Sequence, residues 1–118
     1  MEFDYIYKYT REMALADGVL CDLTQFEITR KYYKYPVACT ETVWNVIEAA
    51  LNNKEECFDL TGILHDIYSM SIIRYKEVDP TTRTFEVYIN HELYQLKSVC
   101  GPGDNLEPVI TIMMIDED

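Results

Sequence analysis

The sequence predicts a single α+β domain, residues 1–118, in which several helices in the N-terminal two thirds pack on a C-terminal antiparallel three-stranded sheet. Up to about Ile73, apolar residues recur at spacings of three and four, which is the period of amphipathic helices. From Phe85 they alternate with polar residues, which is the period of half-buried strands. Helices first and strands afterwards indicate α+β. A chain of 118 residues, 48% of them hydrophobic, can bury one core.

Two short helices are expected in the first third of the chain. Thr10 supplies a capping hydroxyl for the first helix, which ends on Gly18, a residue suited to the left-handed C′ position. Residues 19–23 have the pattern of a brief extended segment. The run Thr24-Gln25-Phe26-Glu27 has the form of a capping box, whose first and last residues satisfy each other's helix-end donors. The second helix is therefore expected to run to about Lys31.

Two longer helices follow. Pro36 disfavours helix at the residue before it, so residues 35–39 are expected to form an extended connection. Thr40 then caps a helix over residues 41–51, whose apolar residues fall at helical spacing. After a polar break, the same spacing predicts a helix over residues 60–73.

Three strands are expected in the last third of the chain. Residues 85–89 alternate strictly, and residues 93–99 and 108–114 have the composition of two further strands. Together they predict an antiparallel meander. Residues 79–82 are expected to be only a turn between the last helix and this sheet.

The chain is strongly acidic, with 21 acidic and 10 basic residues and a net charge of −11. Such a charge repels the phosphates of DNA and RNA over a Debye length, so direct nucleic-acid binding is not expected. One local exception is the run 30–35, in which two lysines and an arginine alternate with three tyrosines. No apolar stretch approaches the roughly 20 residues that cross a bilayer, so no membrane partner is expected.

The cysteines indicate a reducing compartment. Cys21, Cys39, Cys57 and Cys100 are isolated in the sequence, and no pair has the two-residue spacing of a zinc site or a redox couple. Free buried thiols are typical of cytosolic proteins. Residues 1–5 carry acidic and aromatic side chains where a secretory signal would carry basic residues and an apolar run. We therefore expect a cytoplasmic protein without a metal or cofactor.

No recognisable catalytic motif is present. His65 and His91 lie on different predicted elements, and neither has a partner at metal-binding spacing. A cysteine nucleophile needs an electropositive setting, which a chain this acidic does not favour. Carboxylates are abundant, but abundance alone does not make an acid–base pair. We expect no enzymatic activity; a small hydrolase that uses Asp104, Glu107 or a histidine is the enzymatic alternative.

Two features favour contact with a partner. The loop Cys100-Gly101-Pro102-Gly103-Asp104-Asn105 can bend tightly and expose its amides, as a hairpin connection or as a ligand-contacting loop. It lacks the Lys-Ser/Thr and the helix of a phosphate-binding loop. Ten tyrosines, among them the alternating Tyr5, Tyr7 and Tyr9, suit a binding surface, because each combines contact area with a hydroxyl.

Several runs resemble one family of proteins. They are residues 17–20, residues 35–38 with Thr40 and Trp44, and, most specifically, residues 96–104 continued through 107–113. Over nearly the whole chain they are similar to small uncharacterised proteins, with a domain of unknown function, carried by bacteriophages, plasmids and other mobile elements. The resemblance implies no catalytic residue. It implies a context, the cytoplasm of a host bacterium, where small mobile-element proteins often act by binding and disable a host defence.

Two binding functions fit these observations. The first is counter-defence by a homo-oligomer that sequesters a small nucleotide-derived signalling molecule, with bases stacked on tyrosines and phosphates held by Arg or Lys. The second is an acidic inhibitor that mimics nucleic acid and binds a host defence protein such as a nuclease. The glycine-rich loop and its neighbour Lys97 favour sequestration. The residues expected to bind the ligand are Arg11, Lys34, Tyr35, Trp44, Lys97, Gly101 and Gly103.

Overall fold

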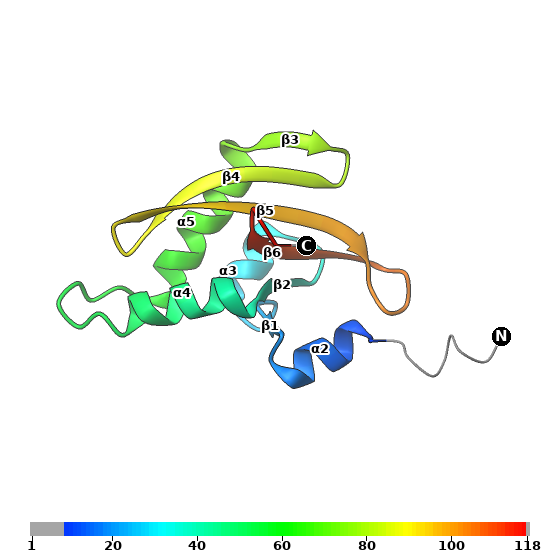
Figure 1. Cartoon of the computed structure of the whole chain (residues 1–118), viewed down its shortest axis with the longest axis horizontal. Coiled ribbons are helices and arrows are strands. Elements are labelled where there is room, and N and C mark those ends of the chain that lie inside the picture. The colour runs from blue at the N-terminus through cyan, green and yellow to red at the C-terminus, as the bar shows by residue number, and fades with distance from the viewer. Residues whose placement is uncertain (1–8, 118) are drawn as a thin grey trace.

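The computed structural model describes residues 9–117, and its strands form one six-stranded sheet (Figure 1). The strand order is β1-β2-β6-β5-β4-β3. All neighbouring strands are antiparallel except β2 and β6, which are parallel. In chain order the elements are α2 (Arg11–Asp17), β1 (Leu20–Asp22), α3 (Glu27–Tyr32), β2 (Val37–Thr40), α4 (Glu41–Leu51), α5 (Leu60–Ile73), β3 (Lys76–Asp79), β4 (Thr82–Ile89), β5 (Glu92–Pro102) and β6 (Pro108–Met114).

The protein is α+β, but the expected three-stranded antiparallel sheet is wrong. The three predicted strands are present as β4, β5 and β6, and β1, β2 and β3 enlarge the sheet at both edges. β1 falls within residues 19–23, which were expected to form a brief extended segment, and β2 overlaps residues 35–39, which were expected to form an extended connection. Strands of three or four residues are too short to display a period of two. All four residues of β3 are exposed, so this strand has no apolar face to reveal it.

The predicted helix ends are confirmed at three places. The Thr10 hydroxyl accepts a hydrogen bond from the Met13 amide at 3.0 Å, and α2 ends at Gly18 with a φ of 79°. The Thr40 hydroxyl accepts from the third residue of α4 at 3.4 Å. Within residues 9–117, no helix is both long enough and apolar enough to cross a membrane.

The predicted capping box of the second helix is wrong. α3 begins at Glu27 after Phe26, which makes no side-chain cap. The Thr24 hydroxyl instead accepts a hydrogen bond from the Val37 amide at 2.8 Å and lies 3.2 Å from the Val37 carbonyl oxygen, to which it donates. A tertiary partner has therefore replaced the local one, and it ties the turn before α3 to β2.

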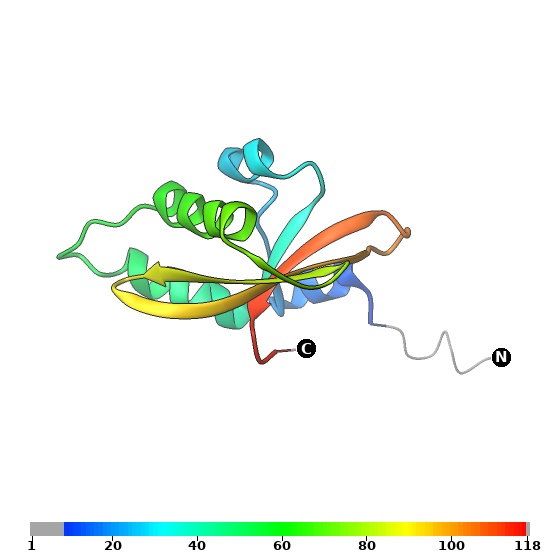
Figure 2. The ribbon, with the colours of Figure 1, turned by 90° about the horizontal axis from the view of Figure 1, so that it is seen from above.

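The core lies on one face of the sheet, which we call the covered face. The register places Phe85 opposite Leu96, and Cys39 beside Ile112, on this face. These residues form one buried cluster with side chains of α4 and α5, among them the fully buried Tyr68. Figure 2 shows α3 and α5 together on one side of the strands.

The opposite face, which we call the open face, is only partly covered. The alternation of side chains along β5 and β6 places Lys97, Val99 and Thr111 on this face. α2 lies against it, because the Arg11 guanidinium donates to the Thr111 hydroxyl at 2.8 Å. At the far end of the β4–β5 hairpin, Tyr88 leaves 67% of its surface exposed.

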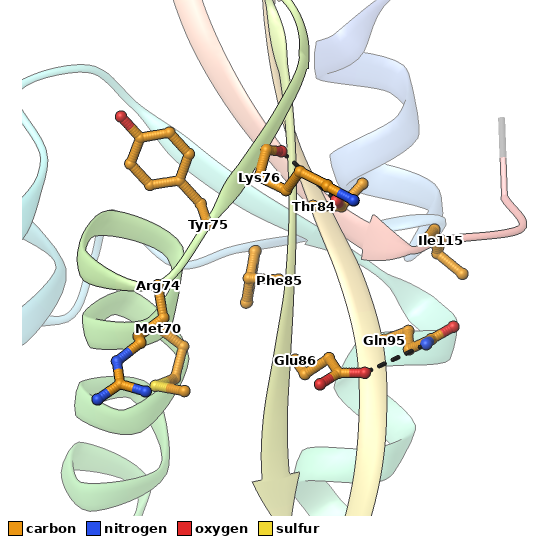
Figure 3. Close-up of a pocket in the computed structure, with 9 residues that line it drawn as sticks. All are labelled: Met70, Arg74, Tyr75, Lys76, Thr84, Phe85, Glu86, Gln95 and Ile115. Atoms are coloured by element: carbon orange, nitrogen blue, oxygen red, sulfur yellow. Dashed lines mark hydrogen bonds between the residues drawn. The ribbon is translucent and has the colours of Figure 1, made fainter.

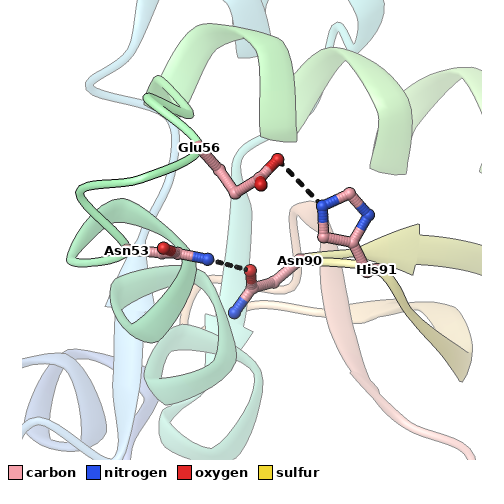
Figure 4. A network of polar contacts seen from close by, with 4 residues as sticks. All are labelled: Asn53, Glu56, Asn90 and His91. Carbon is pink, nitrogen blue, oxygen red and sulfur yellow. Dashed lines mark hydrogen bonds and ion pairs between the residues drawn. The ribbon is translucent and has the colours of Figure 1, made fainter.

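A polar contact ties the β4–β5 turn to the loop between α4 and α5 (Figure 4). Asn90 and His91 form a two-residue turn with φ values of 54° and 69°, as a type I′ hairpin requires. The side-chain amide of Asn53 donates to the side-chain oxygen of Asn90 at 2.8 Å. His91 Nε2 lies 2.9 Å from a Glu56 carboxylate oxygen. His91 therefore belongs to a structural contact.

Candidate functional site

The segment Tyr32–Tyr35, which joins α3 to β2, lines a pocket of about 320 Å³ on the covered face of the sheet. We call it the tyrosine pocket. Its volume falls at the lower end of the range of about 300 to 1,000 Å³ that is usual for small-molecule sites. The remaining lining comes from the β3–β4 turn and from three strands: Pro80, Thr81, Arg83, Ser98, Cys100 and Ile110.

Strand register brings the sheet residues of the tyrosine pocket together. Arg83 of β4 lies directly opposite Ser98 of β5, and Cys100 of β5 lies directly opposite Ile110 of β6. Because side chains alternate along a strand, Ser98 and Cys100 share a face while the residue between them points away. The floor of the pocket is thus built from neighbouring strands and does not depend on a loop.

Hydrogen bonds to α5 anchor the segment Tyr32–Tyr35, which we call the tyrosine wall, through Tyr32 and Tyr33. The hydroxyl oxygens of Tyr33 and Ser71 lie 2.6 Å apart, and Ser71 in turn donates to the Tyr68 carbonyl. The Tyr32 hydroxyl lies 2.6 Å from His65 Nδ1. The Tyr33 ring also packs edge-on against the ring of Tyr68, at 5.4 Å between centroids. A wall fixed in this way needs little ordering when a ligand binds.

The lining of the tyrosine pocket contains two cationic side chains, Lys34 and Arg83, and no carboxylate. Within residues 9–117 the only ion pair joins Glu56 to His91, so neither cation is paired with an acid there. The Arg83 guanidinium stacks over the Tyr75 ring, 4.2 Å from its centroid. In a chain of net charge −11, this pocket is a local site that favours anions.

Burial and charge act in opposite directions on Tyr33. Burial raises the pKa of its hydroxyl, while the hydrogen bond to Ser71 and the positive charge of Arg83 lower it by less. Tyr33 is therefore protonated at neutral pH. Tyr33 therefore adds no negative charge that would oppose an anion.

Ser98 offers a further polar group to a ligand. It leaves only 7% of its surface exposed, and its hydroxyl has no hydrogen-bond partner within the described part of the chain. Its residual exposure faces the tyrosine pocket, which Ser98 lines. A hydroxyl that is open to the pocket can donate a hydrogen bond to an acceptor that a ligand supplies.

Of the seven residues expected to bind a ligand, the structure brings only Lys34 and Tyr35 together in the tyrosine pocket. Lys97 and Gly101 alternate with Ser98 and Cys100 along β5 and so lie on the open face. Trp44 of α4 stacks on another ring, that of Phe26, with an interplanar angle of 8°.

The remaining two predicted residues, Arg11 and Gly103, take structural positions around the β5–β6 loop. The Arg11 guanidinium donates to the Thr111 hydroxyl and to the Ile110 carbonyl. The Asp104 carboxylate accepts hydrogen bonds from the first two amides of α2. A Cβ on Gly103 would lie 2.5 Å from the Glu107 carboxylate, so this glycine permits a close contact inside the loop. The Asp104 carboxylate therefore occupies the α2 amides, and the Glu107 carboxylate occupies the space beside Gly103, that an anionic ligand would need.

Arg83 and Ser98 are among the pocket residues that sequence reasoning missed. Arg83 lies just after the segment that was expected to be only a turn. Ser98 is the neighbour of Lys97, and a strict period of two applied to β5 would have assigned the two residues to opposite faces. The pairing of β4 with β5 brings Arg83 and Ser98 together.

A second pocket, of about 460 Å³, lies where α5 meets β3 and β4 (Figure 3). Arg74 and Lys76 line it, but so does Glu86, which accepts a hydrogen bond from the Gln95 side chain at 3.3 Å. The negative charge of Glu86 therefore offsets part of the attraction that Arg74 and Lys76 would exert on an anion in this pocket. The tyrosine pocket provides the more favourable setting for an anion.

No cluster of three or more potential metal ligands is present among residues 9–117. In comparisons with known proteins, no protein family, curated protein or solved structure matches the chain. The resemblance to mobile-element proteins stays a prediction, and the geometry of the tyrosine pocket is the basis for a functional proposal.

Proposed function

We propose that the chain binds a small nucleotide-derived signalling molecule in the tyrosine pocket and sequesters it without changing it chemically. The observation that carries the proposal is a lining with Lys34, Arg83 and three tyrosines but no carboxylate, in a chain of net charge −11. Cations hold phosphate oxygens through charge-assisted hydrogen bonds. Aromatic rings stack on nucleobases. Sequestration needs no catalytic group.

Each side chain has a definite role in this proposal. Lys34 and Arg83 contact the phosphate, and the Ser98 hydroxyl donates to one of its oxygens. Tyr35, with 45% of its surface exposed, stacks on the base. Tyr33 stays anchored to α5 and keeps the wall in position. The expected setting is counter-defence in the cytoplasm of a host bacterium, as the resemblance to mobile-element proteins implies. The sequestering form is expected to be a homo-oligomer.

The test is native mass spectrometry after incubation with extract from bacteria whose nucleotide-signalling defences have been triggered. The wild-type chain is expected to carry a stoichiometric adduct that is released intact on denaturation. Lys34→Glu reverses a charge in the pocket and should lose the adduct. Lys54→Glu makes the same change at an exposed residue outside the pocket and should keep it. The same spectra give the mass of any homo-oligomer.

Three results would contradict the proposal. If the wild-type chain carries no adduct, it binds no such ligand. If the Lys34→Glu variant keeps the adduct as fully as the wild type does, the ligand does not bind in the tyrosine pocket. A released product of altered mass would establish an enzyme instead.

A second candidate, the acidic mimic of nucleic acid, is favoured by a different observation. Within residues 9–117 no Lys or Arg forms an ion pair with a carboxylate, and the chain carries a net charge of −11 that a basic partner would neutralise. A mimic would co-purify with a basic defence protein, and the complex would weaken steeply with added salt. The Lys34→Glu variant would bind such a partner at least as well as the wild type does.

A further inference from the structure

Two cysteines that are far apart in the sequence are direct cross-strand partners. Cys21 of β1 lies opposite Cys39 of β2 in the antiparallel pair. Both side chains therefore project from the same face of the sheet. Both cysteines are reduced in this structure.

The backbone hydrogen bonds show which kind of pair this is. The Glu41 amide donates to the Val19 carbonyl, and the Leu23 amide donates to the Val37 carbonyl. Hydrogen-bonded pairs alternate along an antiparallel ladder, so the pair midway between these two, Cys21 and Cys39, is also hydrogen-bonded. The Cα atoms of such a pair are about 5.5 Å apart. This is within the usual Cα separation of a disulfide, about 4.4 to 6.8 Å. The Cβ atoms of a hydrogen-bonded pair lie about 5.5 Å apart, which exceeds the roughly 3.5 to 4.5 Å of a disulfide. Closing the bond therefore requires a small shift of β1, which is a three-residue strand at the edge of the sheet.

The two thiols also differ in access to solvent. Cys39 is fully buried, with 0% of its surface exposed, whereas Cys21 is only partly buried. A small oxidant can reach Cys21, and Cys39 is positioned to react with the oxidised sulfur. We propose that Cys21 and Cys39 are a modification site that forms a reversible intramolecular disulfide. The proposal concerns the chain alone and does not depend on ligand binding.

Hydrogen peroxide is the oxidant class that balances the reaction. Burial and the negative charge of Glu41 raise the pKa of the Cys21 thiol, so its thiolate forms increasingly as pH rises. This thiolate attacks one peroxide oxygen, the O–O bond breaks, hydroxide leaves, and Cys21 becomes a sulfenic acid. The Cys39 sulfur then attacks the Cys21 sulfur, the S–O bond breaks, and the oxygen leaves as water with the Cys39 proton. Two thiols have lost two electrons to the peroxide. A dithiol reductant returns them.

The disulfide would close a loop of functional interest. Cys21 and Cys39 flank the segment 22–38, which contains α3 and the tyrosine wall, Tyr32–Tyr35. A cross-link at the base of this loop restricts its unfolded conformations and its local opening. Oxidation should therefore slow amide hydrogen exchange in α3 and in the tyrosine wall.

Peptide mapping tests the bond directly. After treatment of the full chain with hydrogen peroxide, tryptic peptides 12–30 and 35–54 are expected to be joined, and dithiothreitol should separate them. The oxidised chain should unfold at a temperature at least about 5 °C higher than the reduced chain. Exposed Cys57 serves as an internal control, because its oxidation shows that the peroxide was active.

Variants separate the proposal from its alternatives. Cys21→Ser should lose both the joined peptides and the rise in unfolding temperature, whereas Cys57→Ser should keep both. Oxidation of Cys57 without joining of the two peptides would overturn the proposal. So would a cross-link from Cys21 to Cys57 or Cys100 in place of Cys39.

Discussion

Replacing Tyr68 by phenylalanine is expected to lower the free energy of unfolding by about 1 to 3 kcal/mol, because it leaves a buried hydroxyl without its partner. Tyr68 is 0% exposed and Thr29 is 1% exposed. Their hydroxyl oxygens lie 2.6 Å apart, and the Thr29 side chain makes no other hydrogen bond within residues 9–117. The substitution keeps the ring and hence its contacts with Tyr32 and Tyr33. The cost is therefore that of an unsatisfied Thr29, with little change in packing.

A double-mutant cycle isolates this cost. Thr29→Val removes the other hydroxyl and preserves the shape of the side chain. The double variant Tyr68→Phe/Thr29→Val leaves no buried donor or acceptor unpaired, so its loss of stability should fall short of the sum of the two single losses by about 1 kcal/mol or more. Tyr88→Phe is the matched control, since Tyr88 is 67% exposed, and it should change stability by less than about 0.5 kcal/mol.

Urea unfolding followed by circular dichroism measures the wild type and all four variants, with free energies obtained by linear extrapolation. Strictly additive losses would refute the reasoning, because they would mean that neither hydroxyl depends on the other. A loss for Tyr68→Phe as small as that for Tyr88→Phe would refute it as well.

Two further predictions concern backbone conformation and pH. Gly18→Ala should cost about 1 to 2 kcal/mol, because its φ is 79° although nothing lies within 4 Å of an added Cβ. Gly101→Ala, with the same free space and no positive φ, should change stability by less than about 0.5 kcal/mol; equal losses in thermal unfolding would contradict this. Burial raises the pKa values of Tyr33, Tyr68 and Cys39 above their ordinary values of 9.0 to 10.0, so the folded state binds these protons more tightly than the unfolded state does. The resulting stability is complete below the ordinary pKa values and is lost as pH rises towards the folded ones. Urea midpoints should therefore fall above about pH 9, and a midpoint that rises there would contradict the sign.

The two longest helices and the last strand show where local patterns are sufficient. The predicted helices over residues 41–51 and 60–73 and the predicted strand over residues 108–114 match the observed bounds. Each has a clear start signal or enough residues to display its period. The second short helix was predicted at about the right place but with the wrong cap, because Thr24 binds Val37 across 13 residues of chain. Such a partner leaves no mark on the local pattern.

In the candidate site too, residues within one short run were predicted from the sequence, whereas residues brought in by strand pairing were not. Lys34 and Tyr35 were found because cations and tyrosines alternate within one short run. Arg83 and Ser98, which lie beside them in the tyrosine pocket, come from strands about 50 residues or more farther along the chain. Lys97 was predicted in place of Ser98, and a period of two puts these neighbours on opposite faces of β5.

From the sequence alone, we could predict the two long helices, the last three strands, the acidic character of the chain and the segment that carries the tyrosine wall. These properties depend on composition and on contacts within a few residues. The order of the six strands, the parallel pairing of β2 with β6, the partnership of Cys21 with Cys39 and the pocket itself were decided only in the tertiary structure. They depend on hydrogen bonds and packing between segments far apart in the chain, and short or fully exposed strands carry no periodic signal of their partners.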